Sequence, residues 1–391
     1  MNNDELQVLG TENRNHNNTK WIAVAICAVL LIIAYLIYNR CSSTDHSLPL
    51  TQEGSTISPR LQHAADSMLN DKLTEINGLQ GQVIIMNVQT GEIIAMAGRE
   101  RNFEGKFQPC QNFAYQQELG SLMKTASLLI ALETGKAKLD DVVDTGNGVW
   151  EIDENRIFKD HNWRRGGYGE MTLDRTLEVS SNIGIGKTIW KLFKGHEQDF
   201  FNKLDSMSFG QPNSIEGIEG LRPNSYRSPK DSDWVNKDIL WSAIGYNRKI
   251  APIQMLCFYN AIANNGKMVK PTLMPGNSEV INEQIAKSEN VTLMQQTLEH
   301  VVSQGLGNKA GSDRIKVAGK TGTSQVNEYY EGDNTVSEYQ VAFCGFFPAD
   351  APKYSMIVSM NKLGLPASGG GMAGTLFHDI SEWMINNGMM K

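Results

Sequence analysis

The feature that most constrains this chain is an apolar stretch at residues 120–135 that carries a lysine near its start. Its apolar side chains recur at helical spacing and cover most of the circumference, which predicts a buried helix with Gly135 as its C-cap. Buried helices rarely contain lysine, yet Lys124 lies in the first turn of this one. Ser121 precedes it by three residues, so the two side chains share one face of the helix. The sequence therefore predicts a hydroxyl and an amine side by side in a nearly dry place.

Two interpretations of this pair are open. Desolvation lowers the pKa of a buried lysine, and a neutral amine can take the proton of a serine hydroxyl, as in Ser-Lys nucleophiles. The positive end of the helix dipole would also favour negative charge developing on Ser121. Alternatively, Lys124 extends out of the core while Ser121 caps the helix. The spacing alone does not separate them, because Ser-x-x-Lys also occurs at Ser359 and Lys362.

The N-terminal region divides into three segments. Residues 1–20 are polar and rich in Asn, which predicts a disordered tail. Residues 21–39 are uncharged and long enough for a transmembrane helix, with Trp and Tyr near the ends. A cleaved signal peptide is the alternative, but no small-residue cleavage pattern follows. Residues 40–59 are rich in Ser and Thr and predict a linker.

Strand-like segments lie near both ends of the remaining chain, with helix-like segments between them. Residues 82–97 predict a hairpin, because two β-branched runs flank a Gln-Thr-Gly turn. Residues 100–118 predict irregular structure. Further strands are expected at 315–324, 339–347 and 354–360. Helices are expected at 60–76, 252–264 and 292–304, and a final helix should end at about residue 386. This pattern predicts an antiparallel sheet closed by the two ends of the chain, in an α+β layer fold.

Two short polar motifs complete the candidate site. A Lys-Thr-Gly triplet occurs once, at residues 320–322, and Thr323 follows it. A lysine and two hydroxyls on a strand edge suit a carboxylate, and Gly322 admits another backbone. A polar edge strand whose lysine prevents aggregation is the alternative. Ser180 and Asn182 form a Ser-x-Asn motif between two helix-like stretches, a pattern that a simple polar turn also produces.

Composition argues against several functional classes. The net charge is −7 without a basic cluster, so no nucleic-acid partner is expected. The seven histidines form no pair at metal-ligand spacing, and no metal or other cofactor is expected. Residues 319–321 imitate the end of a phosphate-binding loop, but Arg314 stands where that loop requires glycine. The five cysteines indicate no disulfide framework.

In combination, the three motifs resemble those of the penicillin-binding transpeptidases, which belong to the β-lactamase superfamily of serine acyl-transferases and carry them in the same order. The likeness covers about residues 80–385 and includes Gly-Ser-Leu-Met-Lys-Thr at 120–125, Val-Ser-Ser-Asn-Ile-Gly at 179–184 and Val-Ala-Gly-Lys-Thr-Gly-Thr-Ser at 317–324. The resemblance implies the family's transpeptidase domain over residues 60–391. That fold is an antiparallel five-stranded sheet of N- and C-terminal segments, flanked by helices, with an all-helical subdomain inserted.

Two departures from the family's pattern stand out. Leu119 occupies the position before the serine turn where the family often has proline. Class B members usually carry a sizeable pedestal domain between anchor and transpeptidase domain, whereas only about 20–40 residues fill that interval here. Docking of a partner protein through a pedestal is therefore in doubt.

The resemblance implies a role for each residue of the first two motifs. Ser121 would attack the carbonyl of the penultimate D-alanine in a stem peptide ending in D-Ala-D-Ala, and would form an acyl-enzyme. Lys124 would act as the base. Ser180 would relay the proton to the leaving amine, and Asn182 would hold the substrate amide and Lys124.

The third motif would bind the substrate. Lys320, Thr321 and Thr323 would hold the terminal carboxylate, and Gly322 would keep the strand edge open. The backbone amides of Ser121 and Thr323 would form the oxyanion hole.

The resemblance therefore implies a peptidoglycan D,D-transpeptidase that cross-links the cell wall and is acylated by β-lactams. It would be anchored in the inner cell membrane by residues 21–39, with its catalytic domain in the periplasm and cell-wall synthesis proteins as partners. A D,D-carboxypeptidase or β-lactamase is the alternative, and differs in how fast water reaches the acyl-enzyme. A non-catalytic β-lactam sensor or scaffold is a third interpretation, although a sensor needs a cytoplasmic output domain larger than residues 1–20.

Overall fold

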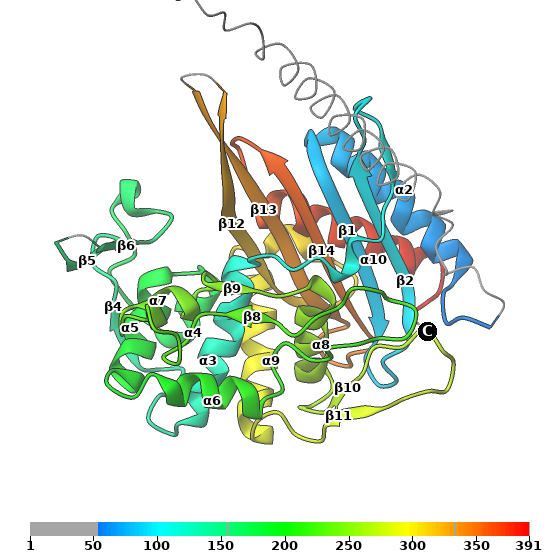
Figure 1. Cartoon of the computed structure of the whole chain (residues 1–391). Helices are drawn as coiled ribbons and strands as arrows, with labels where there is room; N and C mark the ends of the chain where they lie inside the picture. The colour runs from blue at the N-terminus through cyan, green and yellow to red at the C-terminus, as the bar shows by residue number, and fades with distance from the viewer. Residues whose placement is uncertain (1–53, 155, 332–333, 391) are drawn as a thin grey trace, which may run out of the picture. The chain divides into compact units, whose positions relative to one another are not determined.

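A six-stranded antiparallel sheet forms the centre of the fold (Figure 1). The computed structural model describes residues 54–154, 156–331 and 334–390. The strand order is β12-β13-β14-β1-β2-β3, and β1 pairs with β14, for example through Val83 and Val358. The expected antiparallel sheet closed by the two ends of the chain is confirmed. The strands are β1 (Gly78–Asn87), β2 (Ile93–Arg101), β3 (Phe107–Pro109), β12 (Ala318–Glu331), β13 (Asn334–Phe347) and β14 (Tyr354–Leu363).

The sheet has one strand more than the five that the resemblance implied. The additional strand is β3, which pairs along the edge of β2 through Arg99–Pro109 and Arg101–Phe107. It lies within residues 100–118, where irregular structure was expected. A strand of three residues is too short to produce an alternating pattern, so its sequence carries no usable signal.

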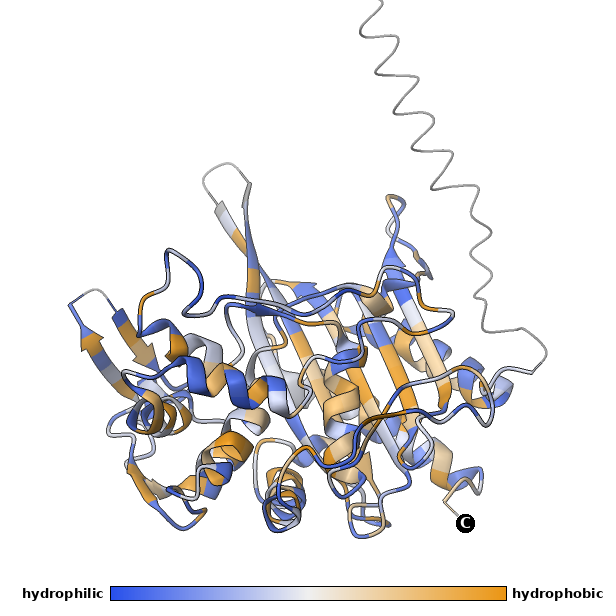
Figure 2. Ribbon diagram, turned by 60° about the horizontal axis from the view of Figure 1, so that its bottom comes forward, coloured by the Kyte–Doolittle hydropathy of each residue, from blue (hydrophilic) through white to orange (hydrophobic). Residues whose placement is uncertain are grey.

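The central strands are apolar on both faces because both faces of the sheet are covered. Along β1, Val83 and Ile85 enter one core, whereas Ile84 and Met86 enter the other. All four side chains are fully buried. Figure 2 shows the same apolar character across the middle strands of the sheet. The predicted hairpin of residues 82–97 is confirmed as β1 and β2.

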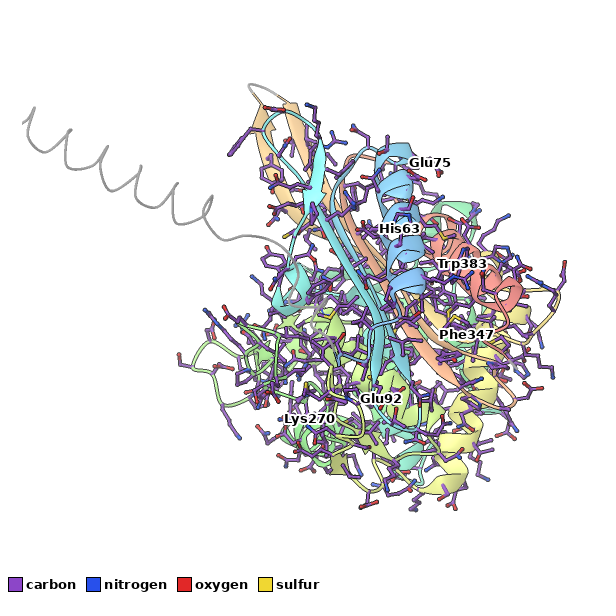
Figure 3. The ribbon with its side chains drawn as sticks, turned by 90° about the vertical axis from the view of Figure 1, so that its right-hand side faces the viewer. His63, Glu75, Glu92, Lys270, Phe347 and Trp383 are labelled. Atoms are coloured by element: carbon purple, nitrogen blue, oxygen red, sulfur yellow. The ribbon has the colours of Figure 1, made fainter. Side chains whose placement is uncertain are left out.

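Two helices cover one face of the sheet and a third covers the other. On the first face, α2 (Pro59–Glu75) and α10 (Thr375–Asn386) lie beside each other. The buried side chains of α2 recur every four residues and make a stripe toward the sheet, at Leu61, Ala65, Leu69 and Leu73. In Figure 3, His63 and Glu75 mark α2, and Trp383 marks the neighbouring α10. On the opposite face, α8 (Pro252–Ala263) packs against β13 and β14.

The chain between β3 and β12 forms the inserted part, but this insertion is not all-helical. Its helices are α3 (Met123–Glu133), α4 (Leu173–Glu178), α5 (Asn182–Phe193), α6 (Gln198–Ser206), α7 (Asp238–Ala243), α8 and α9 (Ser288–Ser303). Its strands form the ribbons β4–β7, β5–β6, β8–β9 and β10–β11. These strands are β4 (Val142–Asp144), β5 (Val149–Asp153), β6 (Arg156–Lys159), β7 (Glu170–Thr172), β8 (Ser225–Tyr226), β9 (Arg248–Lys249), β10 (Met268–Val269) and β11 (Val280–Asn282). The all-helical expectation was wrong because such short, partly polar segments pair locally without a strand pattern in the sequence.

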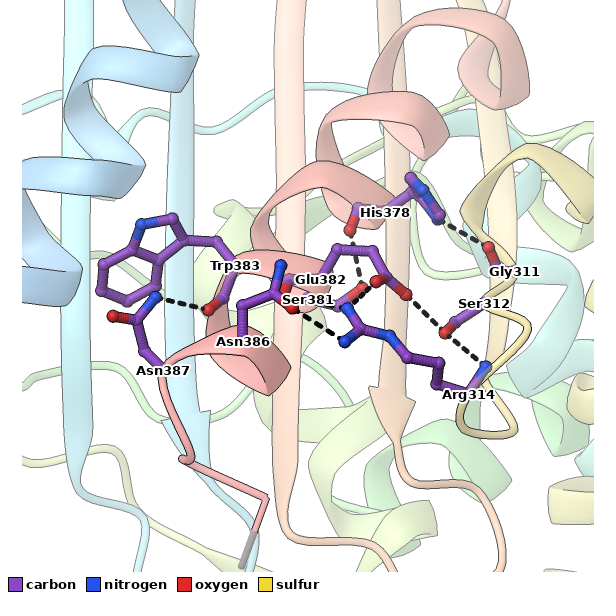
Figure 4. Close-up of polar contacts among 9 residues, drawn as sticks. All are labelled: Gly311, Ser312, Arg314, His378, Ser381, Glu382, Trp383, Asn386 and Asn387. Atoms are coloured by element: carbon purple, nitrogen blue, oxygen red, sulfur yellow. Dashed lines mark hydrogen bonds and ion pairs between the residues drawn. The ribbon is translucent and has the colours of Figure 1, made fainter.

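A polar network fixes the segment that leads into β12. Arg314 forms an ion pair with Glu382 of α10, and Ser312 donates a hydrogen bond to the same carboxylate (Figure 4). Arg314 also donates to Asn386, at 2.8 Å. The ring of His378 contacts the backbone carbonyl of Gly311 at 2.6 Å. These contacts connect α10 to the chain just before the strand that carries Lys-Thr-Gly.

Three of the predicted segments lie wholly or largely outside the described residues. These are the tail at 1–20, the transmembrane helix at 21–39 and the linker at 40–59, of which only residues 54–59 are described. Within the described part of the chain, no helix combines the length and the apolar character needed to cross a membrane.

Candidate active site

The candidate nucleophile lies in a tight turn that is closely packed on two sides. Ser121 belongs to the 3-10 turn η3 (Gly120–Leu122), which continues directly into α3. The predicted helix is therefore present, with its first turn wound as 3-10. A Cβ atom at Gly245 would lie 2.0 Å from the carbonyl oxygen of Gly120, and one at Gly322 would lie 2.7 Å from that of Leu119. Only glycine at both positions allows the turn to lie this close to its neighbours.

Lys124 is fully buried in the first turn of α3. Its amine donates hydrogen bonds to the backbone carbonyl of Ser180 at 2.7 Å and to the Ser180 hydroxyl oxygen at 3.2 Å. Burial lowers the pKa of Lys124 to about 7, and the negative charge of Asp160 opposes this change only in part. The interpretation in which Lys124 extends out of the core is therefore wrong.

Ser180 is held in an unusual backbone conformation by the N-terminus of α5. Its φ is +56°, a left-handed value that non-glycine residues adopt only when the surroundings enforce it. The next residue, Ser181, caps α5 by accepting a hydrogen bond from the backbone N–H of Gly184. Ser181 also donates to the Asp160 carboxylate at 2.7 Å, and Asp160 accepts a second bond from the N–H of Ile183. Asp160 thus fixes the turn that presents Ser180 to Lys124.

Asn182 lies in the same region but has a different partner from the one expected. Its side-chain amide donates to the backbone carbonyl of Lys159 at 2.7 Å. Among the described residues, the hydrogen bonds of the Lys124 amine go to Ser180, and none goes to Asn182.

The Lys-Thr-Gly triplet lies on β12, which borders the inserted helices (Figure 1). Lys320 is fully buried, and its amine donates to the carbonyl and hydroxyl oxygens of Thr321 at 3.1 and 3.3 Å. Burial is the main reason why the pKa of Lys320 lies well below its ordinary value, and the positive charge of Lys124 lowers it further. The hydroxyl of Thr323 accepts a hydrogen bond from the backbone N–H of Gly369 at 2.9 Å, which fastens the 368–371 segment beside the strand.

One cleft of about 380 Å³ brings the three motifs together. It is lined by Ser121, His161, Arg165, Ser180, Asn182, Tyr246, Leu306, Thr321, Thr323 and residues 367–370. Lys124 and Lys320 are buried rather than part of this lining. Hydroxyls therefore face the cleft while two amines lie beneath them, an arrangement suited to proton transfer and to binding an anion.

Several residues of the cleft escaped the sequence analysis. His161, Arg165 and Tyr246 come from loops of the insertion, and residues 367–370 lie shortly before α10. The buried Asp160, which does not line the cleft, was missed as well. Loop residues carry no periodic pattern, so their place in the cleft follows only from the folded chain.

A larger hollow of about 640 Å³ is unrelated to these motifs. It is formed by residues of the 299–317 and 348–350 segments and contains none of the predicted site residues. Within the described residues, no three His, Cys, Asp or Glu side chains are placed to hold a metal ion.

A serine turn, a buried lysine and a Lys-Thr-Gly strand edge around one cleft define a protein of the penicillin-binding class. A family model described as penicillin binding protein transpeptidase domain matches residues 81–382. The chain belongs to this family.

Named relatives support the assignment to this family. Stage V sporulation protein D of Bacillus subtilis is 27% identical over 324 residues, which cover 76% of this chain and 48% of that protein. Peptidoglycan D,D-transpeptidase FtsI of Escherichia coli is 24% identical over 342 residues, covering 82% of this chain and 53% of FtsI. The chain thus spans about half the length of these relatives.

Solved structures share the fold. A peptidoglycan glycosyltransferase from Burkholderia ambifaria has a TM-score of 0.72 at 23% identity, covering 86% of this chain and 98% of that one. The transpeptidase domain of Burkholderia pseudomallei penicillin-binding protein 3 also has a TM-score of 0.72, at 21% identity, covering 86% and 97%.

Proposed function

We propose that this chain is a peptidoglycan D,D-transpeptidase that acts through an acyl-enzyme on Ser121. The observation that carries the proposal is the buried amine of Lys124, hydrogen-bonded to Ser180 beneath a cleft that Ser121 and Ser180 both line. A lysine whose pKa lies near 7 is in part neutral at neutral pH, and a neutral amine can accept the serine proton. The family of the chain supports the same chemistry.

In the proposed reaction, the Ser121 oxygen attacks the carbonyl carbon of the penultimate D-alanine while its proton passes to Lys124. The tetrahedral intermediate collapses as the bond to the terminal D-alanine breaks. Ser180, which contacts the Lys124 amine, relays the proton to the departing amine. A second stem peptide then attacks the Ser121 ester through its own amine and forms the cross-link. As the ester bond breaks, a proton of that amine passes by way of Lys124 to the Ser121 oxygen. Asn182 holds the substrate amide.

The strand edge of β12 supplies the carboxylate site in this proposal. Thr321 and Thr323 line the cleft, and Lys320 lies behind them in contact with the Thr321 hydroxyl. An incoming carboxylate would favour the charged form of Lys320, because an opposite charge nearby raises a lysine pKa. The backbone amides of Ser121 and Thr323 would stabilise the oxyanion, and Gly322 keeps this edge close to the serine turn.

The location and the partners follow from the substrate. We propose residues 21–39 as a single membrane anchor that holds the catalytic domain on the periplasmic side, where peptidoglycan is assembled. The proposed ligands are stem peptides ending in D-Ala-D-Ala and, as inhibitors, β-lactams. Other cell-wall synthesis proteins are the proposed protein partners.

Labelling with a fluorescent penicillin tests the proposal directly. Wild type should be acylated, with the adduct mapped by mass spectrometry to the peptide that contains Ser121, and Ser121→Ala should not be labelled. Ser127→Ala is a matched control, since Ser127 lies on the same helix but donates to the carbonyl of Ala243 in the core. Equal labelling of Ser121→Ala would overturn the proposal. The half-life of the acyl-enzyme then distinguishes a transpeptidase from a hydrolytic carboxypeptidase or β-lactamase, and the absence of any adduct in wild type would favour a scaffold.

A further inference from the structure

The cleft contains a cation that the proposed reaction does not use. Arg165 ends the 3-10 turn η4 (Trp163–Arg165) and lines the same cleft as Ser121. It is exposed, and among the described residues its side chain forms neither an ion pair nor a hydrogen bond. His161, four residues earlier, lines the cleft with it and contacts the Tyr168 hydroxyl at 3.0 Å.

The turn that carries Arg165 is fixed by its backbone. The N–H of Arg165 donates to the carbonyl of Asn162 at 2.7 Å, and the N–H of Asp160 donates to the carbonyl of Gly148 at 3.0 Å. Gly167 packs so closely on the 146–148 segment that a Cβ atom there would lie 2.2 Å from the backbone N of Gly148. A ligand group would therefore meet Arg165 on a preorganised support, which limits the entropy lost on binding.

The charge around this turn suits an anion. None of the described residues that line the cleft is acidic, although the chain as a whole carries a net charge of −7. The carboxylate of Asp160, one position before His161 in the sequence, is buried and accepts hydrogen bonds from the Ser181 hydroxyl and the backbone N–H of Ile183. Burial first, and then the charges of Lys124, Arg165 and Lys320, lower the pKa of His161, and the negative charge of Asp160 opposes them only in part.

In the proposed reaction, the terminal carboxylate of the donor peptide binds at Lys320, Thr321 and Thr323. No group of the substrate is therefore assigned to Arg165. We propose that Arg165 binds a second carboxylate of the donor stem peptide, carried by a residue that precedes D-Ala-D-Ala. Arginine suits this role because its planar donors match a carboxylate and its charge persists at all physiological pH values. The inference rests on the proposed function, and it specifies the substrate as an acidic stem peptide whose carboxylate is not amidated.

Two matched pairs of acyl donors test this specificity on the full-length chain. The first pair is carbenicillin and benzylpenicillin, which differ by one side-chain carboxylate. The second is a synthetic peptide with 2-aminopimelate before D-Ala-D-Ala and the same peptide with that side-chain carboxylate amidated. Acylation of Ser121, or competition with fluorescent penicillin for it, gives the rate for each donor.

In wild type, each acidic donor should react faster than its neutral partner by roughly tenfold, the ratio that one charge-assisted contact provides. Arg165→Gln should remove this preference, and Arg165→Lys should retain part of it. Benzylpenicillin should acylate all variants at the same rate, within about twofold. Arg164→Gln is the control, because Arg164 lies in the same turn but stacks on Trp163.

The outcomes separate the two proposals. If benzylpenicillin acylates Ser121 but neither acidic donor depends on Arg165, the second carboxylate site is refuted and the proposed function stands. If benzylpenicillin does not acylate wild type, the proposed function itself fails. If Arg164→Gln removes the preference as fully as Arg165→Gln, the turn has only a structural role and the inference is wrong.

Discussion

The amine of Lys124 lies 2.7 Å from the backbone carbonyl oxygen of Ser180, a residue 56 positions further along the chain. The carbonyl points at this amine while Ser180 adopts a left-handed φ of +56°. Conformations of this kind cost of the order of 1–3 kcal/mol and persist only where the surroundings enforce them. Here the cap of α5, formed by Ser181 and Asp160, supplies that restraint. The contact therefore joins two sequence motifs through a strained residue, and several predictions depend on it.

The acylation rate should depend on pH through Lys124. Below a pH of about 7 the amine is protonated and cannot accept the Ser121 proton, so the rate should rise with pH and level off above that value. Lys124→Arg should lose this acidic limb and react about 10²–10⁴-fold more slowly, because arginine stays charged. Stopped-flow measurement of penicillin acylation between pH 5 and 9 tests both. A wild-type profile without an inflection would exclude Lys124 as the base.

Replacing Lys124 should stabilise the protein while it abolishes acylation. In the unfolded chain this lysine keeps its proton up to its ordinary pKa of 10.5, whereas burial favours the neutral amine. The resulting destabilisation is complete below pH 7 and fades as pH rises toward 10.5. At pH 7, Lys124→Met should therefore have a free energy of unfolding about 1–4 kcal/mol higher than that of wild type, measured by denaturant titration. This difference in stability should shrink at pH 10. A variant less stable than wild type at pH 7 would contradict this expectation.

The charge of Asp160 should influence the pKa of Lys124. Its negative charge raises that pKa, so Asp160→Asn should move the acidic limb of the acylation profile to lower pH. The same change weakens the bonds from Ser181 and Ile183 and should lower the free energy of unfolding by about 1–3 kcal/mol. Glu170→Gln is a suitable control, because Glu170 is exposed on β7. An unshifted limb in Asp160→Asn would show that the two charges are not coupled.

The close approach of Gly245 to the serine turn predicts a sharp difference between two glycines. In Gly245→Ala the new methyl group would lie 2.0 Å from the Gly120 carbonyl oxygen, so the turn that carries Ser121 must shift. We expect at least a 10²-fold loss of acylation rate, since small misplacement of reacting groups has effects of that size. In Gly220→Ala the nearest atom would be 3.9 Å away. Both glycines have positive φ, so backbone strain is matched and only Gly245→Ala should slow acylation.

The network at the C-terminal helix should matter more at neutral than at acid pH. Burial raises the pKa of Glu382, but the hydrogen bonds from Ser312 and Arg314 outweigh it and hold the pKa below its ordinary value. The stabilisation is thus present above a pH of about 4.5 and is lost as pH falls through the lower folded-state pKa. Glu382→Gln should reduce stability by about 1 kcal/mol at pH 7.

The exposed pair of Glu104 and Lys106 provides the control for this network. Both side chains are more than 70% exposed, so Glu104→Gln should leave stability unchanged at any pH. Equal effects of the two substitutions would mean that the Figure 4 contacts contribute no more than an ordinary surface ion pair.

The parts of the fold with strong periodicity could be predicted from the sequence. The apolar spacing around Lys124 predicted a buried helix, and α3 is buried from Met123 to Leu132. The β-branched runs and the Gly-containing turn between them predicted β1 and β2. By contrast, β3 and the four ribbons of the insertion contain two to five residues per strand, too few to establish a period.

The candidate site was accessible from sequence only where a motif marked it. Ser121, Ser180 and Thr321 stand in such motifs, and the folded chain brings them to one cleft. Arg165 carries no such mark, because its position depends on how a loop is packed. The conformation of Ser180 was equally hidden, since φ is set by the cap of the following helix and not by the identity of the residue.

The pairing of β1 with β14 constrains the order in which the parts of this chain can fold. The N-terminal hairpin must wait for partners that follow the entire insertion, more than 250 residues later in the chain. Closing so long a loop costs conformational entropy, and contacts between such distant segments form slowly. A growing polypeptide also cannot complete the sheet before its last strand has emerged. A chain that stops before Tyr354 would leave the edges of the apolar strands β1 and β13 unpaired. A nascent chain would therefore depend on chaperones until its final segment arrives.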